Sequence, residues 1–94
     1  MPLTNYDYLL KNYDFLSPEQ QRMIDKFISL LPEREQYFAK RKYVDSATYE
    51  QIAEEMSYTV RTIYHIRQRV LEKLKVYVVS RENEILARTM RKIV

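Results

Sequence analysis

The chain of 94 residues contains no glycine and only three prolines. Glycine is the usual residue where the backbone must adopt a positive φ, and proline interrupts helices, so this composition favours helices joined by short connections. Apolar residues recur along much of the chain at three- and four-residue steps, which is helical spacing. The sequence therefore predicts an all-α fold of four to six helices in a single domain spanning residues 1–94.

Composition also argues against several kinds of function. The chain has no cysteine and one histidine, which removes disulfides, thiolate metal sites and cysteine nucleophiles. It has no glycine-rich phosphate loop, and the adjacent Glu54 and Glu55 point about 100° apart on a helix, so they do not converge as a catalytic pair. We therefore expect a protein that is not an enzyme and that uses no metal and no cofactor.

The first fifteen residues lack the basic start and the uninterrupted apolar run of a signal peptide. No segment approaches the ~20 apolar residues that a membrane helix needs. These two features predict a cytoplasmic protein with no membrane contact.

Charge is distributed unevenly along the chain. Residues 1–59 carry seven Lys/Arg and ten Asp/Glu, a net charge of −3, whereas residues 60–94 carry nine Lys/Arg and three Asp/Glu, a net charge of +6. A basic region in an otherwise acidic chain is typical of a nucleic-acid-binding face, but an ordinary solvated helix surface has the same composition. Charge alone leaves both interpretations open.

The first third of the chain contains two predicted helices. The first covers residues 4–14. The second follows Ser17, Pro18 and Gln20, which together have the pattern of a capping box with proline in the first turn. Its apolar face contains Met23, Ile24, Phe27, Ile28 and Leu31, and Pro32 ends it. A set of apolar residues in this third forms either core or a groove for a partner: Tyr6, Tyr8, Tyr13, Phe15, Met23, Phe27 and Ile28.

Further along, residues 43–48 are predicted as a loop, and Thr48 with Gln51 gives a second capping-box pattern. A helix of about two turns follows, and Thr59 is placed to cap a longer one. The inward stripe of the longer helix contains Ile63, Ile66, Val70, Leu74 and Tyr77. This stripe fails near residues 78–80, which predicts a last helix over 81–92; one helix unbroken through 79 is the alternative. The last helix has an apolar stripe that is a candidate for homodimerisation: Ile85, Leu86, Met90 and Ile93.

Residues 49–74 have the spacing of a DNA-binding helix-turn-helix, in which a short helix crosses the DNA backbone and a second helix enters the major groove. Ala53 is the small residue where the two helices cross, and Tyr58 is apolar enough to fill the turn. All the positions that fix the packing match the motif: Ile52, Ala53, Met56, Tyr58, Ile63 and Ile66.

The stretch QIAEEMSYTVRTIYHI at 51–66, with RVLEKL at 69–74, resembles the fourth conserved region of sigma-70 family transcription factors. Upstream, LPERE at 31–35 resembles the start of the first helix of that region, and Tyr43 resembles the aromatic residue that ends it. The resemblance covers residues 30–76, half of the chain. The sequence RTIY at 61–64 more closely resembles the small ArpU/RinA-type late-transcription activators of phages and prophages.

This resemblance implies three parts: N-terminal helices at 1–31, a sigma region 4-like helix-turn-helix at 32–77 and a C-terminal helix at 78–94. It also implies sequence-specific binding to double-stranded promoter DNA in a bacterial host, and activation of late phage or prophage genes by recruiting RNA polymerase. We expect a sigma-like regulator and not a complete sigma factor, because the chain has no room for the domain that reads the other promoter element.

Two sets of residues follow from matching this chain onto the family. The outward positions of the second helix would contact base edges, where Arg pairs with guanine and Gln with adenine: Arg61, Tyr64, His65 and Gln68. The candidates for phosphate contacts, which set register without reading sequence, are Thr48, Tyr49, Thr59, Thr62, Arg67, Arg69 and Lys73. Plain solvated surface is the alternative for Arg61 and His65, and the basic run at 40–42 either flanks DNA or is solvated.

One position departs from the family pattern, because the glycine of the turn is replaced by Ser57. That position commonly takes a left-handed backbone, which costs a residue other than glycine roughly 1–2 kcal/mol. We expect Ser57 to have a positive φ, or the turn to adopt a variant geometry.

Two other functions fit the same sequence. One is a small terminase-like subunit that recognises DNA for packaging and assembles as a ring. The other is a protein-interaction module that keeps the fold as a scaffold and docks onto RNA polymerase.

Overall fold

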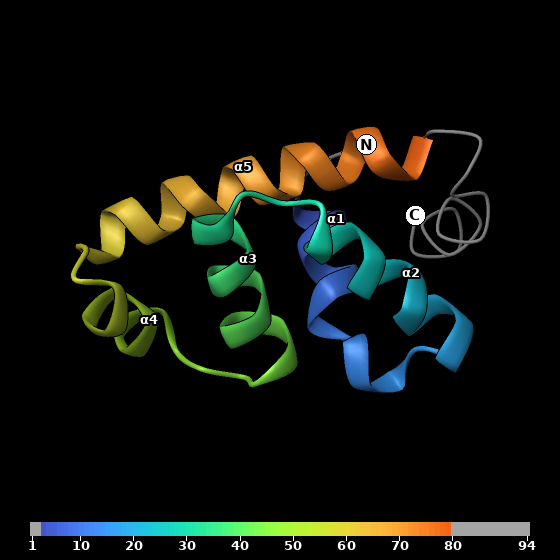
Figure 1. Ribbon diagram of the computed structural model, residues 1–94, viewed down its shortest axis with the longest axis horizontal. Helices are drawn as coiled ribbons and strands as arrows, with labels where there is room; N and C mark the ends of the chain where they lie inside the picture. The colour runs from blue at the N-terminus through green and yellow to red at the C-terminus, as the bar shows by residue number, and fades with distance from the viewer. Residues whose placement is uncertain (1–2, 80–94) are drawn as a thin grey trace.

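A computed structural model describes residues 3–79, which are helical with short connections and contain no strand. The elements in chain order are α1 (Leu3–Lys11), a 3₁₀ turn η1 (Tyr13–Phe15), α2 (Pro18–Ser29), α3 (Glu33–Ala39), a π-helical turn η2 (Lys40–Val44), α4 (Tyr49–Met56) and α5 (Val60–Val79). The all-α prediction is confirmed. Figure 1 shows α5 running along one edge of the molecule, with α1 and α3 beneath it and α4 at its N-terminal end.

Both predicted capping boxes are present. Ser17 Oγ accepts a hydrogen bond from the backbone N–H of Gln20 at 3.2 Å, and Gln20 Oε1 accepts one from the Ser17 N–H at 2.8 Å. Thr48 and Gln51 make the same reciprocal pair at 3.1 and 2.9 Å. Each pair satisfies N–H groups that have no partner within the helix, so these residues fix where α2 and α4 begin.

The core lies where α5 meets α1, α3 and α4. It includes the predicted inward residues of α4 and α5, apart from Met56 and Tyr77, which are partly buried. Leu71 and Val78 are also buried although the predicted stripe omitted them. The largest completely buried side chains are Tyr6, Phe38, Leu9, Leu10, Ile24, Ile28, Ile52, Ile63, Ile66, Leu71 and Leu74. Their burial is the main favourable contribution to the stability of the domain.

The aromatic residues of the N-terminal third differ in burial, and Tyr13 is partly buried against the core. Tyr6 and Phe27 are core residues, and Phe27 packs on Tyr77 of α5 with ring centroids 5.3 Å apart. Tyr8 and Phe15 are exposed, Phe15 at 87% of its surface. The core interpretation therefore holds for the buried members of this set.

The loop predicted over residues 43–48 begins later in the structure, because residues 43 and 44 belong to η2 and only residues 45–48 are non-helical. The helix that begins as α3 widens into η2, in which the Asp45 N–H bonds to the Lys40 carbonyl at 3.0 Å and the Ala47 N–H bonds to the Arg41 carbonyl at 2.9 Å. Tyr43 is buried inside η2, and its hydroxyl donates to Asp7 of α1 at 2.6 Å. That partner is 36 residues away, so no local pattern indicates it.

At its other end α5 continues through Val78 and Val79, which is the alternative of one helix unbroken through 79. The predicted last helix over 81–92, with its dimerisation stripe, lies outside the described residues. Within residues 3–79, no helix has both the length and the apolar character to cross a bilayer.

Candidate nucleic-acid interface

The turn between α4 and α5 is closed without glycine. Ser57 has φ 59° and ψ 39°, a left-handed backbone, which confirms the positive φ expected there. The Tyr58 N–H bonds to the Ala53 carbonyl at 2.9 Å and the Ser57 N–H bonds to the Glu54 carbonyl at 3.2 Å. These two bonds form a Schellman motif, which normally has glycine at the left-handed position. The bend is therefore tight, and it carries backbone strain at Ser57.

The first turn of α5 is held by two threonines. Thr59 Oγ1 accepts from the Thr62 N–H at 3.2 Å, as expected of a capping residue, and lies 3.1 Å from Thr62 Oγ1. Thr48 Oγ1 is used in the same way at the start of α4. Of these three predicted phosphate contacts, Thr48 and Thr59 therefore cap the starts of α4 and α5, and the Thr62 hydroxyl contacts that of Thr59.

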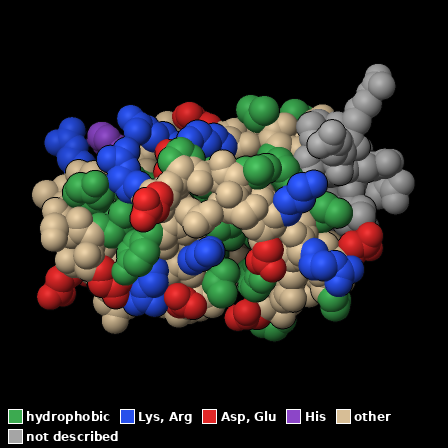
Figure 2. All heavy atoms as spheres, in the orientation of Figure 1, with side chains coloured by type: hydrophobic (Ala, Val, Ile, Leu, Met, Phe, Trp, Pro, Cys, Tyr) green, Lys and Arg blue, Asp and Glu red, His purple; other side chains and the backbone are tan. Residues whose placement is uncertain are grey.

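A stripe of exposed side chains runs along the outer face of α5. Its members follow at steps of three, one, three and one residues, so they share one side of the helix. They are Arg61, Tyr64, His65, Gln68 and Arg69. Figure 2 shows basic side chains gathered around the single histidine at the end of the molecule where α5 begins. Among residues 3–79 neither Arg61 nor Arg69 has a carboxylate partner, so both cations face solvent.

Tyr64 contacts α4 through its ring. Its ring centroid lies 4.8 Å from that of Tyr49, the first residue of α4, with the two rings tilted by 45°. Lys42 Nζ lies 4.4 Å from the centre of the Tyr49 ring. Burial and the nearby Asp7 carboxylate raise the pKa of Tyr49, so its ring stays neutral. Lys42, which belonged to the basic run of undecided role, thus lies beside the predicted contact residues.

Two of the predicted phosphate contacts have their charged groups engaged elsewhere. The Arg67 guanidinium lies 3.2 Å from Asp7 Oδ2 of α1, and Lys73 Nζ lies 2.6 Å from Glu35 Oε1 of α3. Asp7 and Glu35 are the two buried carboxylates of the described chain. The structure therefore separates Arg67 and Lys73 from the outer stripe, although they lie on the same helix.

The position of α4 is set by a cluster on its other side. Arg41 pairs with Glu55 at 2.7 Å and with Asp45 at 3.2 Å, and the Tyr37 hydroxyl donates to Glu55 at 2.8 Å. The hydrogen bonds from Arg41 and then Tyr37 lower the pKa of Glu55 to about 2. Arg41 therefore connects η2 to α4 and does not face the outer stripe.

Tyr58 does not fill the turn as predicted, because 39% of its surface is exposed. It lies beside a groove of about 510 Å³ between α3 and α4, where Arg34 approaches its ring to 5.8 Å. The groove is lined by Glu33, Arg34, Tyr37, Glu55, Met56 and Tyr58. Tyrosine and methionine are enriched at protein interfaces, so the chemistry of this groove suits a protein partner better than DNA.

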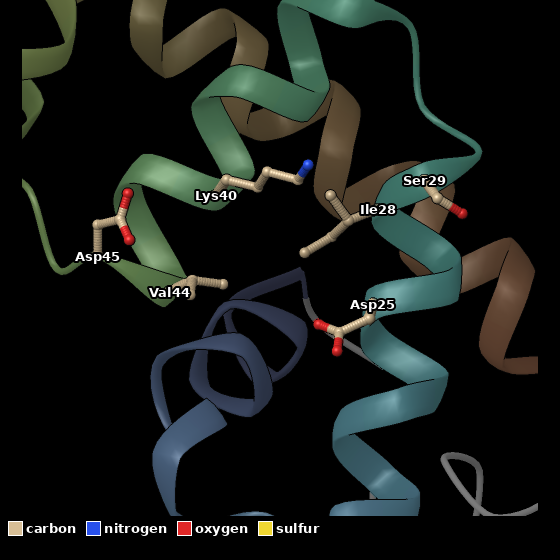
Figure 3. Close-up of a pocket in the computed structure, with 6 residues that line it drawn as sticks. All are labelled: Asp25, Ile28, Ser29, Lys40, Val44 and Asp45. Atoms are coloured by element: carbon tan, nitrogen blue, oxygen red, sulfur yellow. The ribbon is translucent and has the colours of Figure 1, made fainter.

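A second hollow, of about 360 Å³, lies between α2 and the end of α3 with η2. Figure 3 shows Lys40 and Val44 pointing into it from one wall and Ile28 and Asp25 from the other. None of the predicted contact residues lines this hollow. Residues 3–79 also contain no group of three or more His, Cys, Asp or Glu side chains that could hold a metal ion.

The outer stripe offers the chemistry of a base-reading surface. A guanidinium pairs bidentately with guanine, a primary amide pairs bidentately with adenine, and an imidazole donates or accepts. The four predicted base contacts lie together on this surface, and Arg69 joins them. Comparison of the chain with protein-family models, with curated proteins and with solved structures gave no match.

Proposed function

We propose that this protein is a sequence-specific DNA-binding regulator of transcription that inserts α5 into the major groove. The observation that carries the proposal is the exposed stripe of Arg61, Tyr64, His65, Gln68 and Arg69 on a helix that follows a short capped helix and a tight turn. A helix placed in this way can enter the groove while α4 crosses the backbone. One carboxylate borders the stripe: Glu72, one turn beyond Gln68, accepts a hydrogen bond from the Gln68 amide at 3.3 Å.

The finer part of the proposal is activation of phage or prophage late genes through contact with RNA polymerase. Its support is the resemblance at 30–76 together with the groove between α3 and α4. That groove displays two exposed tyrosines, Tyr37 and Tyr58, on a side of the domain other than the outer stripe. A regulator that holds DNA with α5 would leave this groove open to a protein.

Selection of binding sites from random duplex DNA tests the first part. We expect enrichment of one sequence, with affinity that falls steeply as salt rises because bound phosphates release counterions. Arg61→Ala should cost about 1–3 kcal/mol of binding free energy, concentrated at one base pair. Arg22→Ala on α2 removes the same charge from an exposed position away from α5 and should change binding little. Absence of enrichment, with no binding at low salt, would sink the proposal.

Transcription from the selected site tests the second part. Tyr58→Ser should lower the activated level of transcription from the selected site while leaving the affinity of the protein for that site unchanged. The reason is that Tyr58 faces the groove and not the outer stripe. Tyr8→Ser removes another exposed tyrosine, on α1, and serves as the matched control. Equal activation by both variants would remove the groove from the proposal and leave DNA binding standing.

A further inference from the structure

Arg67 lies at the edge of the outer stripe but turns away from it. It follows Tyr64 by three residues and so lies about 60° from it around the helix axis. Its guanidinium reaches Asp7 with two contacts, Nε at 3.4 Å and one terminal nitrogen at 3.2 Å. The side chain is 25% exposed, whereas that of Asp7 is 7% exposed. Without Asp7, a flexible arginine at this position could swing toward a DNA backbone.

Asp7 is held by donors from three elements. Lys11 of α1 lies 3.0 Å from Oδ2, the Tyr43 hydroxyl of η2 donates to Oδ1 at 2.6 Å, and Arg67 of α5 contacts both oxygens. Burial alone would raise the pKa of Asp7, but the hydrogen bonds from Tyr43, Arg67 and Lys11 outweigh it and leave the pKa below its ordinary value. The carboxylate is therefore charged at neutral pH and offers Arg67 the same kind of partner as a phosphate oxygen.

We propose that Asp7 is a positioning residue for DNA specificity, which withholds Arg67 from the DNA backbone by taking the place of a phosphate. The inference rests on the proposed function. A mobile cation beside the base-reading residues can meet a phosphate in any register, whereas the base contacts of the specific complex allow one register. The added contact would therefore strengthen non-specific binding more than specific binding. Discrimination is the ratio of specific to non-specific affinity, so holding Arg67 inside keeps that ratio high.

This role gives α1 a part in recognition, although α1 lies outside the region of resemblance at 30–76. The contact lies next to the buried apolar face of α5, which sets the rotation of the helix about its axis. Tyr64 and Gln68, which lie three residues before and one residue after Arg67, are exposed.

The test compares wild-type protein with Asp7→Asn, Arg67→Gln and the double variant. Affinity is measured over a salt series for an alternating poly(dA–dT) duplex and for the duplex that wild-type protein selects from random DNA. Asp7→Asn should steepen the dependence of log affinity on log salt by roughly 0.9 on poly(dA–dT), the effect of one added phosphate contact. Its ratio of specific to non-specific affinity should fall.

The two remaining variants separate this role from a merely structural one. Arg67→Gln alone should leave the salt dependence unchanged, because Arg67 is withheld in the wild type. In the Asp7→Asn background, Arg67→Gln should return the salt dependence to the wild-type value. Asp14→Asn removes the same charge from an exposed neighbouring turn and should leave it unchanged. If Asp7→Asn acted only by loosening the packing, binding would weaken, and adding Arg67→Gln would not restore the wild-type salt dependence.

Each outcome has a defined consequence. A lower salt dependence for Arg67→Gln alone would show that Arg67 contacts DNA in the wild type, and it would overturn the inference even if Asp7→Asn fails to fold. An unchanged salt dependence in a folded Asp7→Asn protein would do the same. Both results leave the proposed function standing, whereas failure of wild-type protein to bind either duplex removes the proposed function and the inference together.

Discussion

Two sides of α5 carry the same kind of residue in opposite situations. On the outer side Arg61 and Arg69 face solvent with no carboxylate partner among residues 3–79. On the sides toward α1 and α3, Arg67 and Lys73 are paired with the buried carboxylates Asp7 and Glu35. The charge of a residue therefore does not assign its role. The carboxylates on neighbouring helices select which cations hold the fold and which remain available to a ligand.

The largest expected effect comes from breaking the paired side at Asp7. Asp7→Ala leaves the buried Tyr43 hydroxyl without its acceptor and removes the partner of Arg67. We expect the free energy of unfolding to fall by about 2 kcal/mol, less than the ~3–5 kcal/mol of a fully buried pair because Arg67 and Lys11 keep access to water. Denaturation by urea measures this change, and Asp14→Ala should shift the midpoint little. Equal midpoints for the two variants would contradict the structural role of Asp7.

A smaller effect is expected at the turn that orients the unpaired side. Ser57→Gly should relieve the left-handed strain of roughly 1–2 kcal/mol but make the unfolded chain more flexible, for a net gain of about 0.5–1 kcal/mol. Ser46 has the same φ of 59°, so Ser46→Gly should behave alike. Thermal unfolding checks both. A folded Ser57→Gly protein that melts clearly below the parent would show that the serine contributes more than its backbone conformation.

Removing one cation from the outer side of α5 and one from the side toward α3 tests whether the two sides differ in DNA binding. Arg69→Gln should lower the salt dependence of DNA binding by roughly 0.9, because it deletes an available phosphate contact. Lys73→Gln should leave the salt dependence unchanged and instead lower stability, since Glu35 is buried and loses its ion pair. Binding isotherms at several salt concentrations, with melting curves of both variants, separate the two. A lower salt dependence for Lys73→Gln, with an unchanged one for Arg69→Gln, would show that the Lys73–Glu35 pair of the structure does not persist when DNA binds.

The two sides also differ in how far sequence predicts them. The capping pairs Ser17 with Gln20 and Thr48 with Gln51, the strained Ser57 and the outward stripe depend on residues within one or two turns, and all of them could be read from local spacing. The partners of Arg67 and Lys73 lie 60 and 38 residues away, and only the packing of α1 and α3 against α5 brings them together. Local pattern places a cation on a helix face, but tertiary structure determines whether it is already neutralised.

The extension of the helix at Tyr43 has the same cause. The sequence predicted a loop from residue 43, whereas Tyr43 lies within η2 and its hydroxyl reaches the buried Asp7. A π turn is rare and occurs mostly as a single turn next to an α-helix, as η2 does after α3. The contact joins residues 36 positions apart, so no local pattern of the sequence indicates it.

The smallest expected effect concerns Glu55, which lies on the surface and not in either buried pair. The hydrogen bonds from Arg41 and Tyr37 lower its pKa from 4.5 to about 2. A carboxyl whose folded-state pKa is lowered stabilises the fold above its unfolded value, so this contribution is complete above pH 4.5 and is lost as pH falls toward 2. Glu55→Gln should therefore be less stable than the parent at neutral pH and equal to it near pH 2, by an amount below that of Asp7→Ala because solvent screens the pair. Urea denaturation of both proteins across this range measures the difference, and a gap that stays constant with pH would mean that charge at Glu55 does not hold α4 against η2.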